Sequence, residues 1–191
     1  MCVVADVGIH FNNQGEFIPP DVYLQSRGLK QYQNGAVNDA MATLKGSAQF
    51  GNDLSKYIVA MIYFEKKDWV TGYTWLNLVD KPVEDRDILL KKFNSQLTKK
   101  ELELSQAKLV ELKKQYNDLV SLQRRDKWER SIVATGTRIS GIKAYVNRNI
   151  NIGIGGVPVS SYKLSRQILN YVHEIEPEGI IIMGEIKEKS D

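Results

Sequence analysis

The chain has 191 residues, of which 42% are hydrophobic and 26% are charged, and its net charge is +3 at pH 7. This composition is close to that of an average globular domain, which excludes collagen-like, low-complexity and largely disordered chains. The one cysteine, Cys2, cannot form a disulfide within the chain, so the hydrophobic core alone must stabilise the fold.

The first 80 residues are predicted to be mainly β-structure. β-Forming residues flank the turn Asn12–Gly15, and this pattern predicts a short hairpin. Residues 21–34 have mixed polarity, and we expect a loop that contains a single helical turn. Apolar residues at helical spacing between 37 and 44 predict a short helix that Gly46 could end.

Residues 56–79 fit both a strand pattern and a helix pattern. Tyr57–Phe64 and Trp69–Val79 are rich in β-branched and aromatic residues, and a polar break separates them. This favours a second hairpin, which is our prediction. A continuous helix from Asn52 to Phe64 is the alternative, because hydrophobic periodicity alone does not separate a buried strand from a buried helix.

Two helices are predicted in the middle of the chain. The first begins near Pro82, because proline suits a first turn and the acidic residues that follow suit the positive end of the helix dipole. Thr98 and Glu101 have the spacing of a capping box, so a second helix is predicted from about Thr98 past Trp128. Too few unbroken heptads are present for a long coiled coil, which favours a helical hairpin or a helix that lies on the sheet. The second helix carries an apolar stripe of four residues: Leu109, Leu112, Tyr116 and Leu119.

The C-terminal part is predicted to form a β-α-β unit. Residues 149–154 alternate in polarity and indicate a strand, and the glycines that follow indicate a loop through Val159. Ser160 or Ser161 can cap the next helix. The apolar run Ile180–Met183 then indicates a buried second strand.

Together these elements predict an α+β fold with a long helical middle, in which two hairpins and the C-terminal β-α-β unit build one sheet. The length suits one domain that spans residues 1–191. Within it we expect a mainly β part over residues 1–80, a basic helical part over residues 81–146 and a β-α-β end over residues 147–191.

The positive charge is concentrated in the helical middle. The net charge is −2 over residues 1–86, +7 over residues 87–148 and −2 over residues 149–191. Concentrated positive charge attracts polyanions such as nucleic acids or lipid headgroups. The candidate polyanion-binding residues are Lys113, Lys114, Arg124, Arg125, Lys127 and Arg130. The favoured interpretation of this stretch is a solvated helix face on which interspersed acidic residues form ion pairs at i,i+3 and i,i+4.

Glu185 and Lys187 are the candidate catalytic residues. The segment Glu185-Ile186-Lys187 resembles the strand motif of metal-dependent nucleases, in which a carboxylate binds Mg²⁺ and a lysine stabilises charge on the phosphate. Such a site needs a second acidic ligand, and Glu176 and Glu178 are unusually close in sequence to serve. A strand that ends in a charged tail is therefore the favoured interpretation.

His10 and His173 are the only histidines, and no His/Cys cluster has the spacing of a metal site. Asp6 and His10 would share one strand face and could form an acid–base pair, although an ordinary hydrogen-bonded pair is favoured. The glycine-rich loop from Gly153 lacks the ending of a P-loop and the spacing of a dinucleotide fingerprint. The sequence therefore predicts no metal and no cofactor.

These features favour a non-enzymatic interaction or assembly protein that acts through its long basic helices. The predicted partner is another protein or a second copy of the chain, with a polyanion as a further contact. A nucleic-acid-binding module is the alternative, and a Mg²⁺-dependent nuclease centred on Glu185 and Lys187 is a third hypothesis.

Localisation follows from the absence of membrane and secretion signals in the sequence. No apolar run approaches the roughly 18 residues that a membrane span requires. The first residues also lack the basic segment and apolar core of a secretory signal. We expect a cytoplasmic or virion-internal protein, with secretion left open for a chain from which a signal peptide has been removed.

Overall fold

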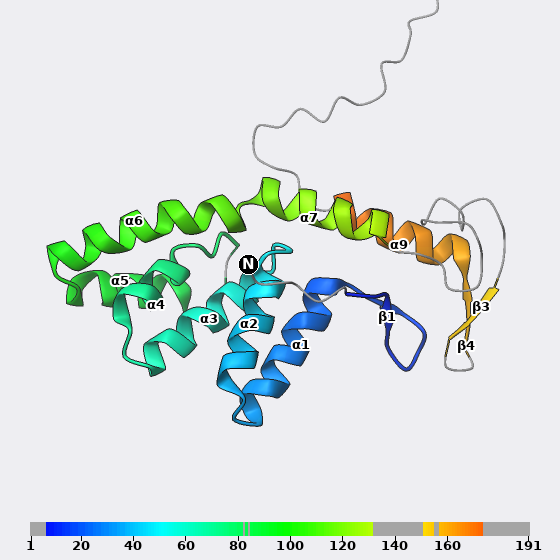
Figure 1. The fold of residues 1–191 in the computed structure, drawn as a ribbon, viewed down its shortest axis with the longest axis horizontal. Coiled ribbons are helices and arrows are strands. Elements are labelled where there is room, and N and C mark those ends of the chain that lie inside the picture. The colour runs from blue at the N-terminus through cyan, green and yellow to red at the C-terminus, as the bar shows by residue number, and fades with distance from the viewer. Residues whose placement is uncertain (1–6, 82, 84, 132–150, 155–156, 174–191) are drawn as a thin grey trace, which may run out of the picture.

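The computed structural model describes residues 7–81, 83, 85–131, 151–154 and 157–173, and helices dominate this part of the chain (Figure 1). The helices are α1 (Pro20–Gln33), α2 (Val37–Ala48), α3 (Asp53–Glu65), α4 (Trp69–Leu76), α5 (Arg86–Gln96), α6 (Lys99–Tyr116), α7 (Asp118–Ser131) and α9 (Ser161–His173). The strands form two antiparallel pairs, β1 (His10–Phe11) with β2 (Phe17–Ile18) and β3 (Asn151–Ile154) with β4 (Val157–Ser160). The predicted α+β class with a long helical middle is confirmed.

The N-terminal hairpin forms where the sequence predicts it. The Asn12 side chain accepts hydrogen bonds from the backbone N–H groups of Gln14 and Glu16, which fixes the turn between β1 and β2. Gly15 has a φ of +74°, a left-handed conformation that glycine adopts without steric strain. Local turn chemistry is therefore sufficient to explain this element.

The pair β1–β2 and the pair β3–β4 form separate two-stranded sheets among the described residues. The single sheet that we expected is therefore not present there. The predicted strand at residues 149–154 is confirmed in part as β3. The predicted loop through Val159 is wrong at its end, because Val157 to Ser160 form β4. The helix predicted from Ser161 is confirmed as α9, whereas the predicted strand Ile180–Met183 lies outside the described residues.

Residues 21–34 form most of α1 and not the predicted loop. Pro20 occupies the first turn of this helix, where its missing N–H group leaves no intrahelical hydrogen bond unmade. Gly28 packs against Leu44 of α2, and a Cβ atom at Gly28 would lie only 2.7 Å from the Leu44 Cγ atom. The glycine that suggested a loop instead allows α1 and α2 to approach closely.

The predicted second hairpin at residues 56–79 is also wrong, because this segment forms α3 and α4. Asn52 caps α3 by accepting a hydrogen bond from the Ser55 N–H group at 2.8 Å. Asp68 caps α4 in the same way through the Thr71 N–H group at 3.1 Å. The alternative helix from Asn52 is therefore the observed structure, and the first 80 residues are mainly helical within their described range.

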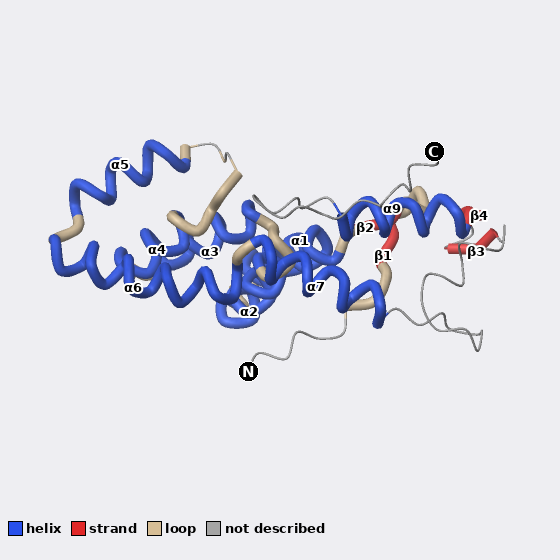
Figure 2. Tube along the Cα trace, turned by 90° about the horizontal axis from the view of Figure 1, so that it is seen from above, coloured by secondary structure: helices blue, strands red, loops and turns tan. Residues whose placement is uncertain are grey.

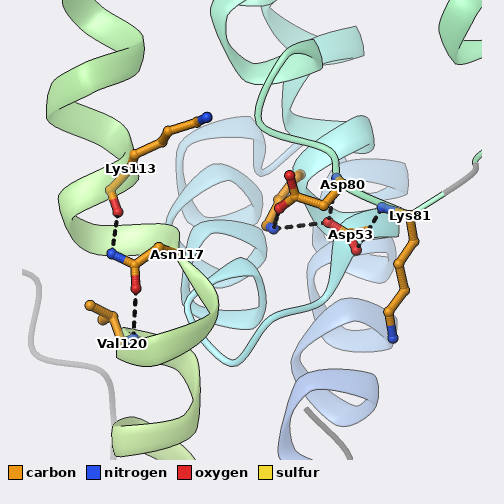
Figure 3. A network of polar contacts seen from close by, with 7 residues as sticks. Asp53, Asp80, Lys81, Lys113, Asn117 and Val120 are labelled. Atoms are coloured by element: carbon orange, nitrogen blue, oxygen red, sulfur yellow. Dashed lines mark hydrogen bonds and ion pairs between the residues drawn. The ribbon is translucent and has the colours of Figure 1, made fainter. Parts of the chain in front are cut away.

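The helix predicted from Thr98 past Trp128 is divided into α6 and α7. The capping box of Thr98 and Glu101 is present at the start of α6. Asn117 ends α6 with an extended ψ of 165°, and its side-chain carbonyl accepts a hydrogen bond from the Val120 N–H group of α7 at 2.8 Å (Figure 3). The first predicted helix also begins later than expected, since α5 starts at Arg86.

The break at Asn117 changes which apolar residues are buried. Tyr116 is buried, and Leu109 and Leu112 pack against the same core. Leu119, the fourth residue of the predicted stripe, lies beyond the break at Asn117 and is 46% exposed. α6 packs on helix α4 and not on a strand pair, whereas α7 contacts the β1–β2 hairpin through the stacked rings of Trp128 and Phe17.

Two hydrophobic clusters stabilise this arrangement. The first lies among α2, α3, α4, α5 and α6, and it contains the stacked rings of Phe64 and Phe93, whose centroids are 4.0 Å apart. The second joins the N-terminal segment to α7 and α9 through Trp128, Tyr171 and Ile168. α6 and α7 run in succession along one side of the molecule, from the α5 end to α9 (Figures 1 and 2).

Candidate functional site

The basic residues predicted to bind a polyanion lie on two helices and have different partners. Lys114 forms an ion pair with Glu111 at 2.7 Å, and Arg130 forms one with Asp126 at 2.9 Å. These are the i,i+3 and i,i+4 pairs expected of a solvated helix face. Surface pairs of this kind contribute little to stability, so the side chains can still exchange partners.

Arg125 is buried and has a structural role, which corrects its prediction as a surface contact. Its side chain donates from Nε to the Phe50 carbonyl at 2.8 Å and from Nη1 to the Tyr171 carbonyl at 2.7 Å. Its guanidinium carbon also lies 4.2 Å from the centroid of the Tyr171 ring. With 5% exposure, Arg125 is not accessible to a polyanion.

Arg124 is half-buried and donates a hydrogen bond to the Gln49 side chain, which connects α7 to the end of α2. Burial lowers the pKa of Arg124 from its ordinary value. Lys113 and Lys127 are exposed on α6 and α7. The predicted set therefore does not form one continuous basic face, and binding of a polyanion by its exposed members stays a prediction.

A buried lysine joins α3 to the segment that follows α4, where Asp53 lies beside Asp80 and Lys81 (Figure 3). Lys56, only 1% exposed, lies 2.8 Å from the Asp53 carboxylate and 3.3 Å from the more exposed Asp80 carboxylate. Asp53 also accepts hydrogen bonds from the N–H groups of Asp80 and Lys81. With its donors and acceptors satisfied, this cluster has the features of a structural ion pair.

The described residues contain no group of three or more His, Cys, Asp or Glu side chains that could hold a metal ion. His10 stacks on Tyr23 with ring centroids 3.5 Å apart, and burial together with the nearby Arg27 lowers the pKa of His10. Its predicted partner Asp6 lies outside the described residues, as do Glu185 and Lys187. The nuclease hypothesis is therefore untested.

Within the same described ranges, no helix is both long enough and apolar enough to cross a membrane.

Three pairs of adjacent lysines lie in the α3–α4 turn, in α5 and at the start of α6, and we call them the lysine-pair surface: Lys66, Lys67, Lys91, Lys92, Lys99 and Lys100. All six side chains are exposed and form no ion pair with the described residues. Trp69 stacks on Phe93 with ring centroids 5.7 Å apart, which brings the α3–α4 turn beside α5. The sequence signal for this surface is the pairing of adjacent lysines, which is weaker than the denser basic stretch of α7.

Two carboxylates next to the lysine-pair surface, those of Asp68 and Glu101, are held by local hydrogen bonds. Asp68 caps α4, and Glu101 is part of the α6 capping box. Hydrogen bonds from the side chain and backbone of Thr98 lower the pKa of Glu101. Exposed apolar side chains lie on the same helices, including Trp69, Ile88 and Leu104. The surface therefore combines apolar contact area with positive charge that no described carboxylate neutralises.

The described part of the chain defines a mainly helical α+β protein with an exposed basic helical end. No model of a known family, no curated protein and no solved structure matches the chain. Its function must therefore be inferred from its own geometry and chemistry.

Proposed function

We propose that this chain is a non-enzymatic interaction protein whose exposed α5 and α6 faces bind an acidic protein partner. One observation carries the proposal, namely how little of these two helices is buried. Of the 11 residues of α5 only Phe93 is buried, and of the 18 residues of α6 only Ser105 and Tyr116 are buried. A surface helix normally buries an apolar stripe of about 100° or more against its core. Most of the surface of α5 and α6 is thus available to a partner.

The chemistry of the exposed face supports a protein as the partner. Ile88, Leu104 and Val110 are 67%, 51% and 53% exposed, and apolar side chains of this size supply the central contacts of protein interfaces. The exposed lysines of the lysine-pair surface would attract an acidic surface at long range. An acidic protein surface satisfies both the apolar contacts and the charge.

A nucleic acid is the second candidate, and the internal use of α7 arginines counts against it. Phosphate recognition depends on accessible Arg and Lys side chains. In the predicted patch Arg125 is buried, Arg124 is bonded to Gln49, and Arg130 is paired with Asp126. The four exposed members, Lys113, Lys114, Lys127 and Arg130, are separated by the break between α6 and α7.

The proposal is tested by charge reversal at two sets of four residues. In the first variant Lys91, Lys92, Lys99 and Lys100 are replaced by Glu. The matched control carries the same change of charge in a set from the predicted patch: Lys113, Lys114, Lys127 and Arg130. Binding of poly-L-glutamate and of a short DNA duplex is measured by fluorescence anisotropy at about 50 mM and about 300 mM salt, since screening weakens charge-driven binding.

We expect the wild-type chain and the control to bind poly-L-glutamate at the lower salt concentration. The first variant should lose that binding, because it replaces four exposed positive charges by negative ones. No poly-L-glutamate binding by the wild-type chain would contradict the proposal. The nucleic-acid alternative would instead be established if the wild-type chain bound DNA more tightly than poly-L-glutamate and only the control variant lost DNA binding.

A further inference from the structure

An open cavity of about 510 Å³ lies between α6 and the helices α2, α3 and α4. This volume is within the range of about 300–1,000 Å³ that is typical of small-molecule sites. The cavity is separate from the lysine-pair surface, since none of the six lysines of that surface contributes to its lining.

Two lysines line the cavity, and both have neutral partners. Lys45 donates from Nζ to the Tyr63 hydroxyl at 2.8 Å, and Lys108 donates from Nζ to the Thr71 hydroxyl at 2.9 Å. Neither ammonium group forms an ion pair with any described residue. Because an ammonium group has three donors, each lysine retains donors for a ligand.

The cavity has an excess of positive charge. Among the described residues that line it, Glu111 is the only acidic one, and its carboxylate lies 2.7 Å from Lys114, which is not part of the lining. The Lys45 ammonium also lies over the rings of Tyr63 and Trp75, at 5.2 Å and 5.6 Å from their centroids. These rings hold Lys45 in place without neutralising its charge.

The walls of the cavity are mainly apolar. Trp75 is almost completely buried, and its ring meets the Tyr116 ring edge to face with centroids 4.8 Å apart. Leu112 and Ala107 add aliphatic surface from α6. The Thr74 hydroxyl is already engaged, since it bonds the Val70 carbonyl and the Ser105 hydroxyl. The polar recognition that the cavity offers therefore comes chiefly from its two lysines.

We propose that this cavity binds a small organic anion with an apolar body, such as an aliphatic or aromatic carboxylate. The anionic group pairs with the ammonium groups of Lys45 and Lys108. The apolar body packs against Trp75 and Leu112, so a neutral analogue of the same shape binds less tightly. This inference does not rest on the proposed function, because the cavity shares no residue with the lysine-pair surface.

The test uses the full chain and the fluorescent probe 1-anilinonaphthalene-8-sulfonate, which combines an aromatic body with one negative charge. Decanoate and decanol are the competitors, because they share an apolar chain and differ in charge. We expect decanoate to displace the probe at about one tenth of the decanol concentration or less, since its carboxylate accepts charge-assisted hydrogen bonds from the lysine ammonium groups that the decanol hydroxyl does not.

Replacement of the cavity lysines should weaken probe binding. Lys45→Met and Lys108→Met should each raise the Kd of the probe by about tenfold, while each methionine retains most of the side-chain volume. The double variant K45R/K108R should retain binding because it retains both charges. Lys113→Met, on the exposed surface of the same helix α6, is the matched control and should leave the Kd unchanged.

A second variant separates loss of the site from loss of the fold. Ala107 is exposed at the cavity rim, so Ala107→Trp should fill the cavity while circular dichroism and thermal unfolding stay unchanged. The proposal is overturned if Ala107→Trp or the folded lysine variants bind the probe as the wild-type chain does. Equal displacement by decanol and decanoate, or absence of probe binding, would also overturn it.

Discussion

Arg125 connects three segments that are far apart in the sequence. Its hydrogen bonds reach the Phe50 carbonyl at the end of α2 and the Tyr171 carbonyl in α9, while the residue itself belongs to α7. Buried carbonyl groups that lose their donors are destabilising by about 1–3 kcal/mol each. The cation also lies over the Tyr171 ring, which compensates part of its desolvation.

Replacement of Arg125 should therefore reduce stability. Arg125→Met should lower the free energy of unfolding by about 2–3 kcal/mol, because it removes charged donors from buried carbonyl groups. Lys127→Met is the control, since exposed Lys127 should change stability by about 0.5 kcal/mol or less. Urea unfolding followed by circular dichroism measures both values. Equal unfolding midpoints for the two variants would show that Arg125 is not a structural residue.

The same residue shows why the sequence could not locate the basic surface. Arg125 lies in a dense basic stretch, and sequence alone does not distinguish a charged side chain that finds buried carbonyls from one that faces solvent. The buried face of α7 consists of Ser121, Arg125 and Trp128, at helical spacing. Only Trp128 in that row is apolar, so a hydrophobic pattern could not reveal which face of α7 packs inward.

Two glycines within helices differ in the space that surrounds them. Gly28 lies where α1 meets α2, and an added Cβ atom would be 2.7 Å from the Leu44 Cγ atom. Gly46 in α2 has more space, since its added Cβ atom would meet the Leu24 Cδ1 atom at 3.7 Å. The same substitution should thus have opposite effects at the two positions.

We expect Gly28→Ala to destabilise the protein by about 1–3 kcal/mol through overpacking. Gly46→Ala should stabilise it by about 0.5–1 kcal/mol, because alanine has the higher helix propensity and makes an ordinary contact here. Thermal unfolding of the two variants tests this difference. A higher melting temperature for Gly28→Ala than for the wild-type chain would contradict the observed approach of α1 and α2.

Local chemistry predicted some elements well and others poorly. The Asn12 turn, the Thr98 capping box and the start of α9 depend on nearby residues, and all three are observed. The hairpin predicted for the aromatic and β-branched segments was wrong, since these segments form α3 and α4. Their side chains are buried by other helices, and such tertiary packing overrides the strand propensity of the individual residues.

The two core clusters differ in how far apart their members lie in the sequence. The first is built from residues between Met41 and Tyr116, which belong mostly to consecutive helices. The second requires the Trp128 Nε1 group to meet the Val7 carbonyl, 121 residues away in the sequence, and requires α9 as well. Contacts between distant residues form more slowly because the chain must close a longer loop.

During refolding, the backbone amides of the two clusters should therefore become protected from hydrogen exchange in a defined order. In pulsed hydrogen exchange, amides of α3 and α4 should gain protection before amides of α7 and α9. The expected reason is the shorter loop closure within the first cluster. Simultaneous protection of both groups would indicate that the clusters form as one cooperative unit. Earlier protection of α9 would contradict the predicted order.

The three tryptophans are distributed so that each one belongs to a different region. Trp69, 44% exposed, lies beside the lysine-pair surface, Trp75 forms a wall of the cavity, and Trp128 is buried in the second cluster. In a variant that retains a single tryptophan, the fluorescence would therefore report on one region only. The protein thus contains its own optical reporters for partner docking, for ligand entry and for opening of the α7–α9 contact.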